Sequence, residues 1–244
     1  MKGIILAAGY ATRLYPLTKD RPKALLPVGG KPIIDYIVSE FETIPEIDEV
    51  IVISNHKFAS HFEKWAENHA SSLKLTVLDD GTTDDSNKLG AVGDLAYTVK
   101  KLEIDDELFV IAGDNLFTFR LKDYYDYYRE KNADCILVKE MEKKSDLTRM
   151  ANVKTDENGK VTYMVEKPKE PVSNLAAFAA YIYRKDTVLM LDTYLKEGNN
   201  PDAPGFFPSW LHTKKPVYAY AFSGTCYDIG THESYAEVCE IFGK

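Results

Sequence analysis

The stretch 4–31 reads IILAAGYATRLYPLTKDRPKALLPVGGK, and it decides the fold of this chain. It begins as an apolar run ending at Leu6, as in a buried strand, and then breaks at the small residues 7–9. Small residues at the end of a strand let backbone N–H groups approach a phosphate without obstruction by side chains. The loop that follows carries positive charge of two kinds, the planar guanidinium of Arg13 and the point charge of Lys23. The stretch therefore predicts a strand followed by an anion-binding loop.

Two common glycine-rich phosphate motifs do not fit this loop. A P-loop would need a glycine at position 25 and Ser or Thr after Lys31, whereas these positions hold Leu25 and Pro32. A dinucleotide-binding fingerprint runs directly into a helix, but Pro16 and Pro22 interrupt the chain after Gly9. The loop is therefore of another kind.

Outward from this loop, the first half of the chain alternates between helical and strand patterns. Apolar residues at helical spacing follow Pro32, and short β-branched or apolar runs separate the helices. The predicted elements are a helix over 32–44, a strand over 49–54, a helix over 58–69, a strand over 73–78, a helix ending at 102 and a strand over 107–112. This alternation predicts an α/β fold with a doubly wound, mainly parallel, Rossmann-like sheet, in which ligands lie beyond the carboxyl ends of the strands.

The rhythm changes in the second half, which is richer in strands. A strand over 134–140 precedes a hairpin over 150–165 that turns at Asn158-Gly159, the dipeptide favoured in tight turns. Helices over 185–197 and 206–212, a strand over 216–222 and a last helix from 232 complete the pattern. We expect one domain over 1–244, divided into halves at 1–120 and 121–244.

Composition excludes several classes of protein. The net charge of −8 over 244 residues argues against a nucleic-acid-binding surface as the main function. The three cysteines, Cys135, Cys226 and Cys239, are widely spaced and form no C-x-x-C pair, so we expect reduced thiols and no zinc site. Because an apolar strand pattern begins at once, we expect no signal peptide, and no apolar run approaches the ~20 residues that span a bilayer. We expect a cytoplasmic protein.

Two aspartates, one in each half of the chain, are candidate metal ligands. Asp114 comes after Gly113 at the end of the predicted central strand, and Asp228 lies in the sequence Asp228-Ile229-Gly230-Thr231. A carboxylate at the carboxyl end of a strand can hold Mg²⁺, which takes one or two carboxylates and completes its shell with phosphate and water. It can equally cap the following turn or helix, and the residues alone leave both readings open.

Five segments together resemble the sugar-nucleotide pyrophosphorylases, also called sugar-1-phosphate nucleotidyltransferases. The resemblance covers nearly the whole chain, in family order: Leu6-Ala7-Ala8-Gly9-Tyr10-Ala11-Thr12-Arg13-Leu14 with Arg21-Pro22-Lys23, Leu89-Gly90-Ala91, Gly113-Asp114, Glu166-Lys167-Pro168 with Asn174 to Tyr181, and Asp228-Ile229-Gly230-Thr231. The chain departs from the family pattern in four places, one of which is Tyr227 or Cys226, where a tryptophan is more usual. Ala11 and Ala179 each replace a glycine, and the polar stretch 84–87 lacks the glutamine that reads the base.

The resemblance implies a glycosyltransferase-A-like fold with a small β-rich, sugar-binding insertion, and a role for each matched residue. Arg13, Lys23 and Asp114 would be catalytic, and Mg²⁺ would lie on Asp114 and Asp228. The remaining matches would bind substrates: Leu6, Ala7, Ala8, Gly9, Asp85 and Gly90 the nucleotide, in the half 1–120, and Glu166, Lys167, Asn174 and Ala179 the sugar phosphate, in the half 121–244.

The implied reaction transfers a nucleotidyl group from a nucleoside triphosphate, dTTP or UTP before CTP, to a sugar-1-phosphate, by default glucose-1-phosphate. Two alternatives stay open: a cytidylyltransferase acting on a non-sugar phosphate such as phosphocholine, and a non-catalytic nucleotide-sugar-binding subunit. We expect no nucleic-acid or membrane partner, and a homo-oligomer is compatible with the sequence.

Overall fold

A computed structural model describes residues 1–243, except for the side chain of Lys144. The chain divides into two compact units, and the division is not a single cut in the sequence. The first unit comprises 1–88, 111–122 and 224–244, and the second comprises 89–110 and 123–223. Within the described residues, no helix is long and apolar enough to span a membrane.

The first unit is built on a parallel sheet. Strand β1 (Lys2–Leu6) pairs with β4 (Glu49–Ser54), and β4 pairs with β5 (Lys74–Asp79), each in parallel. The register sets Leu6 opposite Ile53 and Ser54 opposite Asp79, so the carboxyl ends of the three strands share one edge of the sheet. The central strands β1 and β4 are almost wholly buried, as expected for parallel strands covered on both faces.

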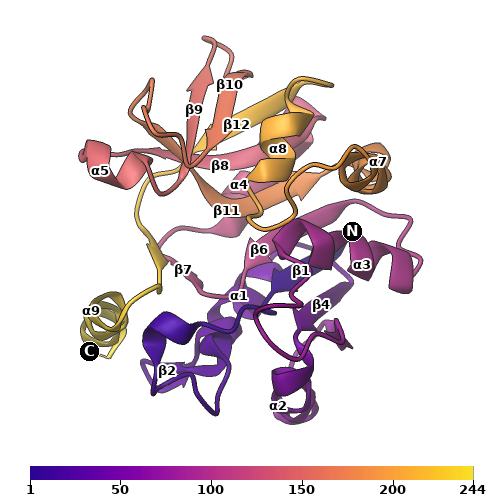
Figure 1. Cartoon of the computed structure of the whole chain (residues 1–244), viewed down its shortest axis with the longest axis vertical. Coiled ribbons are helices and arrows are strands. Elements are labelled where there is room, and N and C mark those ends of the chain that lie inside the picture. The colour runs from indigo at the N-terminus through magenta and orange to yellow at the C-terminus, as the bar shows by residue number, and fades with distance from the viewer. Residues whose placement is uncertain (244) are drawn as a thin grey trace. The chain divides into compact units, whose positions relative to one another are not determined.

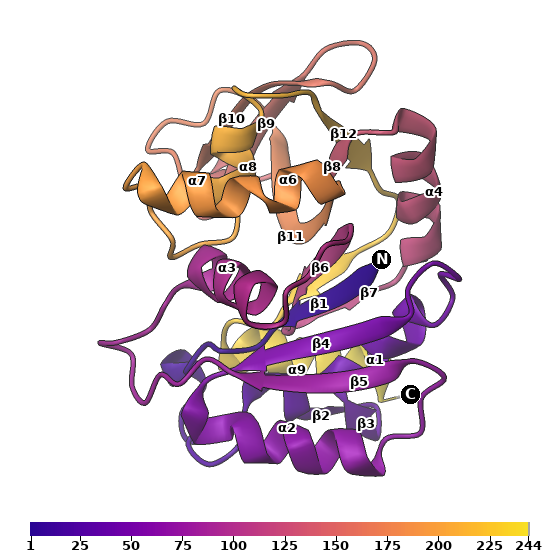
Figure 2. The same cartoon turned by 90° about the vertical axis from the view of Figure 1, so that its right-hand side faces the viewer.

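Two helices of the first unit connect these parallel strands. Helix α1 (Ile33–Phe41) begins after Pro32 and buries the stripe Ile33, Ile34, Ile37, Val38 and Phe41. Helix α2 (His56–Asn68) packs against β4 and β5 (Figure 2). It starts where the Asn55 side chain accepts a hydrogen bond from the N–H of Phe58, a regular N-cap. These connections confirm the α/β, Rossmann-like prediction.

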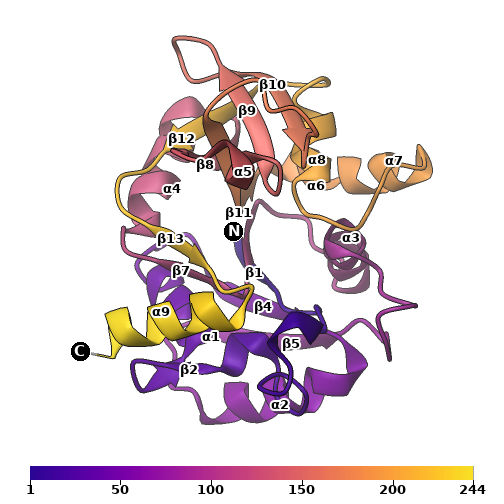
Figure 3. The ribbon, with the colours of Figure 1, turned by 60° about the vertical axis from the view of Figure 1, so that its left-hand side comes forward.

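The rest of the first unit consists of short elements and a terminal helix. They are two 3₁₀ turns, η1 (Thr12–Leu14) and η2 (Lys23–Leu25), the hairpin of β2 (Pro27–Val28) and β3 (Lys31–Pro32), the ladder of β7 (Asn115–Phe117) with β13 (Cys226–Asp228), and α9 (His232–Phe242). Figure 3 shows β13 leading directly into α9. A capping box between Thr231 and Ser234 starts that helix.

The second unit is the β-rich part of the chain (Figure 1). Strand β8 (Asp134–Glu140) lies between β12 (Val217–Ala221), parallel to it, and β11 (Leu175–Tyr183), antiparallel to it. Strand β11 also pairs with β9 (Ala151–Thr155), which forms the predicted hairpin with β10 (Val161–Glu166). Strand β6 (Leu108–Ala112) is divided between the units, because residues up to 110 belong to the second unit and residues from 111 belong to the first. The helices of this unit are α3 (Ala91–Lys101), α4 (Leu121–Lys131, whose first two residues belong to the first unit), α5 (Lys144–Leu147), α6 (Lys185–Val188), α7 (Met190–Lys196) and α8 (Phe206–Leu211).

Candidate active site

The first unit brings the two predicted metal carboxylates together through the β7–β13 ladder. Asp228 pairs in register with Asn115, the residue after Asp114, and the N–H of Ile229 donates to the Asp114 carbonyl over 3.2 Å. Asp114 acts strongly on Asp228. The negative charge of Asp114, followed by burial, raises the pKa of Asp228 to about 6, against the opposing charges of Lys23 and Arg13. Asp228 is exposed to solvent, so we regard repulsion by Asp114, and not burial, as the principal cause.

Asp114 stands where it does because of the glycine before it. A Cβ on Gly113 would lie 3.1 Å from Ile5, 3.2 Å from the Leu6 carbonyl and 3.3 Å from Ala24. The N–H of Gly113 donates to that Leu6 carbonyl over 2.9 Å. Glycine therefore lets the end of β6 lie against both β1 and the η2 turn, which carries Lys23.

Lys23 forms an ion pair with Asp114. Its Nζ donates to Asp114 Oδ2 over 2.6 Å, and the two side chains are only 17% and 26% exposed. Pro22 caps the η2 turn in an extended conformation, and buried Ala24 fixes the turn against Gly113. Arg13 lies in the exposed η1 turn and is close enough to Asp228 to lower its pKa. We call Arg13, Lys23, Asp114 and Asp228 the charged cluster.

Ala11, one of the departures from the family pattern, keeps the backbone conformation of a glycine. Its φ of 49° and ψ of 40° are left-handed, and its carbonyl accepts a 2.7 Å hydrogen bond from the hydroxyl of Thr18, which is fully buried. A non-glycine residue in this region costs roughly 1–2 kcal/mol. Ala11 therefore holds a backbone conformation that favours glycine, and it does so with strain.

The predicted nucleotide-binding residues 6–9 line the end of β1. The N–H of Ala7 donates to the Ile53 carbonyl over 2.9 Å, and the Ala8 carbonyl accepts from the side chain of Asn55 over 2.8 Å. A Cβ on Gly9 would meet no atom within 4 Å, so its backbone is open from that side. Asn55 was not predicted, although its place between a strand and a helix is the usual N-cap signal.

Asp85 and Gly90, predicted to contact the nucleotide, lie in different units. Asp85 is exposed in the first unit, where its carboxylate lies 3.6 Å from the ammonium of Lys88. Gly90 precedes α3 in the second unit with φ at 79°. A Cβ there would lie 2.5 Å from the Pro201 carbonyl, so close packing also requires glycine. Nucleotide contact by these two residues stays a prediction.

The second unit holds the predicted acceptor residues around the end of β10. The Glu166 side chain is only 7% exposed, and burial raises its pKa, against the opposing charge of Lys167. Lys167 has a left-handed backbone with φ at 48°, and its Nζ lies 3.8 Å from Glu166 Oε1. Strain of this kind in a non-glycine residue concentrates at functional sites. Pro168 follows it and is buried.

The other two predicted acceptor residues lie on and beside β11. Asn174 is exposed just before the strand, and its carbonyl accepts from the N–H of Met141 over 2.8 Å. Ala179 lies where the register of β11 against β8 shifts, between Phe178 and Tyr181. An unpredicted residue, Asn152, organises this region because its buried amide bonds the loop 172–175 on both sides.

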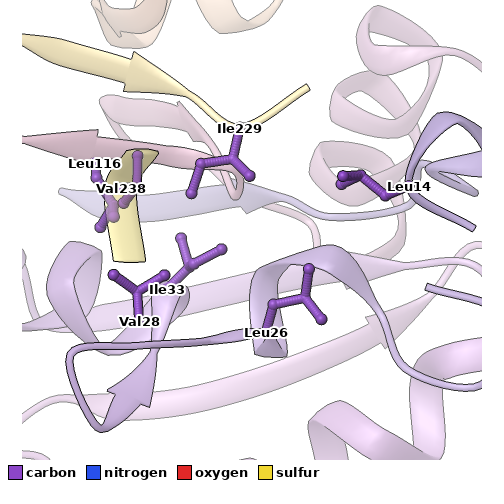
Figure 4. Packing of buried hydrophobic residues seen from close by; sticks show 7 residues of the cluster. All are labelled: Leu14, Leu26, Val28, Ile33, Leu116, Ile229 and Val238. Atoms are coloured by element: carbon purple, nitrogen blue, oxygen red, sulfur yellow. The ribbon is translucent and has the colours of Figure 1, made fainter. Parts of the chain in front are cut away.

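A core of seven side chains supports the charged cluster (Figure 4). Its members are Leu14, Leu26, Val28, Ile33, Leu116, Ile229 and Val238, and each is no more than 3% exposed. Four of them lie within three positions of Arg13, Lys23, Asp114 or Asp228 in the sequence. The same buried contacts therefore position all four charges.

Comparison with known proteins defines the class to which this fold and site belong. The family model described as nucleotidyl transferase matches residues 2–242. The chain therefore belongs to the nucleotidyl transferase family and is an enzyme of this class.

Individual relatives are named as sugar-1-phosphate nucleotidyltransferases. A UTP–glucose-1-phosphate uridylyltransferase of Staphylococcus epidermidis is 31% identical, over 94% of this chain and 87% of that protein. A Sulfolobus acidocaldarius protein, provisionally named a mannose-1-phosphate guanyltransferase, is 29% identical over 98% of this chain. The chain spans 62% of the length of that relative.

The chain is also similar to a solved structure of a Bacillus anthracis protein. That protein is provisionally named a glucose-1-phosphate thymidylyltransferase, and its structure contains a sucrose. The two structures align with a TM-score of 0.78 and 26% sequence identity, and the alignment covers 100% of this chain and 96% of the Bacillus chain.

Proposed function

We propose that this enzyme transfers a nucleotidyl group from dTTP or UTP to a sugar-1-phosphate, with glucose-1-phosphate as the default acceptor, in a Mg²⁺-dependent reaction. The observation that carries the proposal is the charged cluster of the first unit. It combines two mutually repelling carboxylates with a lysine and an arginine, a set suited to phosphates and a divalent cation. The names of the Staphylococcus and Bacillus relatives support the choice of base and sugar.

The donor set fits Mg²⁺. The described residues contain no group of three or more His, Cys, Asp and Glu that could hold a metal, but Mg²⁺ is commonly bound through one or two carboxylates plus substrate phosphates and water. The raised pKa of Asp228 indicates unbalanced negative charge beside Asp114, which a divalent cation would neutralise. Bound there, Mg²⁺ would supply charge neutralisation and orientation of the phosphates.

The protein's residues then supply binding and electrostatic stabilisation, not covalent chemistry. An oxygen of the sugar phosphate forms a bond to the α-phosphorus of the nucleotide, and the bond to the bridging oxygen breaks as pyrophosphate leaves with the electron pair. The nucleophile is already an anion, so no general base is required. In this proposal Lys167 holds the sugar phosphate and Glu166 accepts from sugar hydroxyls. Lys23 stabilises the α-phosphate and Arg13 the leaving pyrophosphate.

The test is pyrophosphate release across a grid of nucleoside triphosphates and phosphorylated acceptors, each with Mg²⁺ or with excess EDTA. We expect release with a pyrimidine triphosphate and a hexose-1-phosphate, and loss of release in EDTA. Release only with a non-sugar phosphate such as phosphocholine would replace this proposal with the cytidylyltransferase alternative. Nucleotide-sugar binding without any release would favour a non-catalytic subunit.

Variants of the charged cluster test the residue roles. Asp114→Asn and Lys23→Ala are expected to lower kcat by about 100-fold or more, because the first removes a proposed ligand of Mg²⁺ and the second removes positive charge at the α-phosphate. Lys64→Ala, which removes an exposed lysine on α2 outside the cluster, is the matched control and should leave kcat unchanged. Near-normal turnover of either cluster variant would contradict the assignment. A cytoplasmic location stays a prediction, and the oligomeric state stays open.

A further inference from the structure

A short segment of the second unit contacts two of the predicted binding residues at once. This segment, Asn200–Gly205, joins α7 to α8 and is called here the 200–205 strap. It is anchored at its start, where the Tyr194 hydroxyl donates to the Asn200 carbonyl over 2.5 Å. At its end, Phe207 of α8 is 1% exposed and packs edge-on against the rings of Tyr183 and Tyr194. The strap is thus held at both ends by buried aromatic side chains.

The middle of the strap caps helix α3. The N–H groups of Ala91 and Val92 donate to the carbonyls of Asp202 and Pro201, each over 2.9 Å. The first N–H groups of a helix have no partner within it, and an anion or a capping group usually satisfies them. Here the strap supplies the caps. The bare Cα of Gly90 allows it to approach, since a Cβ there would lie 2.5 Å from the Pro201 carbonyl.

The end of the strap lies against the Glu166 carboxylate. A Cβ on Gly205 would lie 2.0 Å from Glu166 Oε2 and 3.0 Å from its Cδ. Gly205 has φ at −72°, a conformation open to any L-residue, so space and not backbone geometry requires glycine here. Glu166 is deeply buried and α8 packs on β10, so the carboxylate has little freedom to move aside.

We propose that the 200–205 strap is a positioning element for the acceptor. Gly205 leaves the space that the Glu166 carboxylate occupies. The hydrogen bonds of the Pro201 and Asp202 carbonyls to the first N–H groups of α3 fix the position of the strap. The proposal rests on the proposed function, in which Glu166 binds the sugar. A side chain at 205 would meet Glu166 and Ala151, displace the carboxylate and weaken acceptor binding, while the caps that Pro201 and Asp202 provide beside Gly90 stay in place.

The test is a double-mutant cycle between Gly205→Ala and Glu166→Asp, read as KM for each substrate and as kcat. Gly205→Ala is expected to raise KM for the sugar-1-phosphate roughly tenfold or more and to change KM for the nucleotide less than about twofold. Glu166→Asp shortens the side chain and should raise the acceptor KM by itself. The double variant should be no worse than Glu166→Asp alone, because the shorter carboxylate no longer meets the new methyl group.

Gly93→Ala is the matched control. The methyl group that it adds in the same unit would lie 3.1 Å from Leu89 Cβ and 3.8 Å from Pro201 Cβ of the strap, and it would not meet Glu166. We expect its acceptor KM to stay near that of the wild type. An unchanged acceptor KM in Gly205→Ala, an equal rise in both KM values, or additive effects in the double variant would overturn the proposal.

Melting temperatures of the same variants separate this proposal from the function on which it rests. Gly205→Ala should lower the melting temperature, and Glu166→Asp should restore part of the loss. Wild-type protein that releases no pyrophosphate with any sugar phosphate would overturn the proposed function and the acceptor role of the strap. Whatever the activity, melting temperatures that show no coupling between positions 205 and 166 would contradict the packing of Gly205 against the Glu166 carboxylate.

Discussion

Asp228 and Asp114 carry the sharpest electrostatic conflict in the first unit. The charge of Asp114 is the main reason that the pKa of Asp228 rises to about 6, although Lys23 and Arg13 act in the opposite direction. Lys23 is already paired with Asp114 over 2.6 Å, so its charge is only partly available to Asp228. A carboxyl group in this position destabilises the folded protein when it ionises to the carboxylate. A bound cation would offset this destabilisation.

The pH dependence of stability follows from this conflict. The folded-state pKa of Asp228 is raised, so its contribution to stability is complete below pH 4 and is lost as the pH rises through about 6. In EDTA, Asp228→Asn should therefore be more stable than the wild type at pH 7.5, by the order of 1 kcal/mol after allowance for the solvent exposure of the side chain. The advantage should vanish near pH 4, as measured by urea unfolding at both pH values.

The same variant reports on Mg²⁺ without any turnover. Added Mg²⁺ should raise the unfolding midpoint of the wild type at pH 7.5 and leave that of Asp228→Asn nearly unchanged. Asp84→Asn, at an exposed aspartate outside the cluster, is the control and should respond to Mg²⁺ as the wild type does. An equal Mg²⁺ response in Asp228→Asn and the wild type would exclude Asp228 as a ligand.

Single residues also mark the limit of prediction from sequence. The chemistry of Arg13, Lys23 and Asp114 could be proposed because charge type and position after a strand are visible in the sequence. The left-handed backbones of Ala11 and Lys167, with φ of 49° and 48°, could not be derived from residue type. Neither is a glycine or asparagine, the residues that usually signal this conformation. Surrounding contacts impose it, such as the hydrogen bond from Thr18 to the Ala11 carbonyl.

At the scale of elements, prediction succeeded where the signal is local. The strands over 49–54 and 134–140 were placed with the observed bounds, because β-branched and apolar runs mark both. Strands β7 and β13 were missed. Each has three residues, and they lie more than a hundred positions apart, so only tertiary pairing defines them. That same ladder brings Asp114 and Asp228 together. The family resemblance implied both as metal ligands, but the element that joins them was not predicted.

Ile229 tests how strongly this ladder and its core position the cluster. It follows Asp228 and is fully buried in the seven-residue core. Ile229→Ala should lower the free energy of unfolding by about 2–4 kcal/mol through loss of packing. It should also weaken the Mg²⁺-induced rise in unfolding midpoint, because the backbone that carries Asp228 loses its anchor. Chemical unfolding with and without Mg²⁺ measures both effects.

Ile241→Ala is the control for Ile229→Ala. Ile241 lies near the end of α9 and is 42% exposed, so the same kind of truncation should change stability by less than about 0.5 kcal/mol. If Ile229→Ala lost stability but kept the full Mg²⁺ response, the core would support the fold without positioning Asp228.

At the scale of the whole molecule, the first unit is assembled from three separate segments of the chain. Its last segment, 224–244, supplies β13, α9 and three features of the site: Asp228, Ile229 and Val238. All three residues belong to the first unit. The alternating first half and the β-rich second half were visible in the sequence. The return of the chain to complete the first unit was not, because no local pattern records which earlier segment a late strand will pair with.

Removal of 224–244 should therefore affect the two units unequally. The variant ending at Ser223 lacks the partner of β7 and two members of the buried core, Ile229 and Val238. Amide hydrogen exchange should show protection in β1 and β4 falling by at least about tenfold, while β8 and β11 of the second unit keep most of theirs. A full-length Ile229→Ala variant should show the same pattern to a smaller degree. Equal loss of protection in both units would instead show that the chain unfolds as one cooperative body, in which 224–244 stabilises the whole molecule.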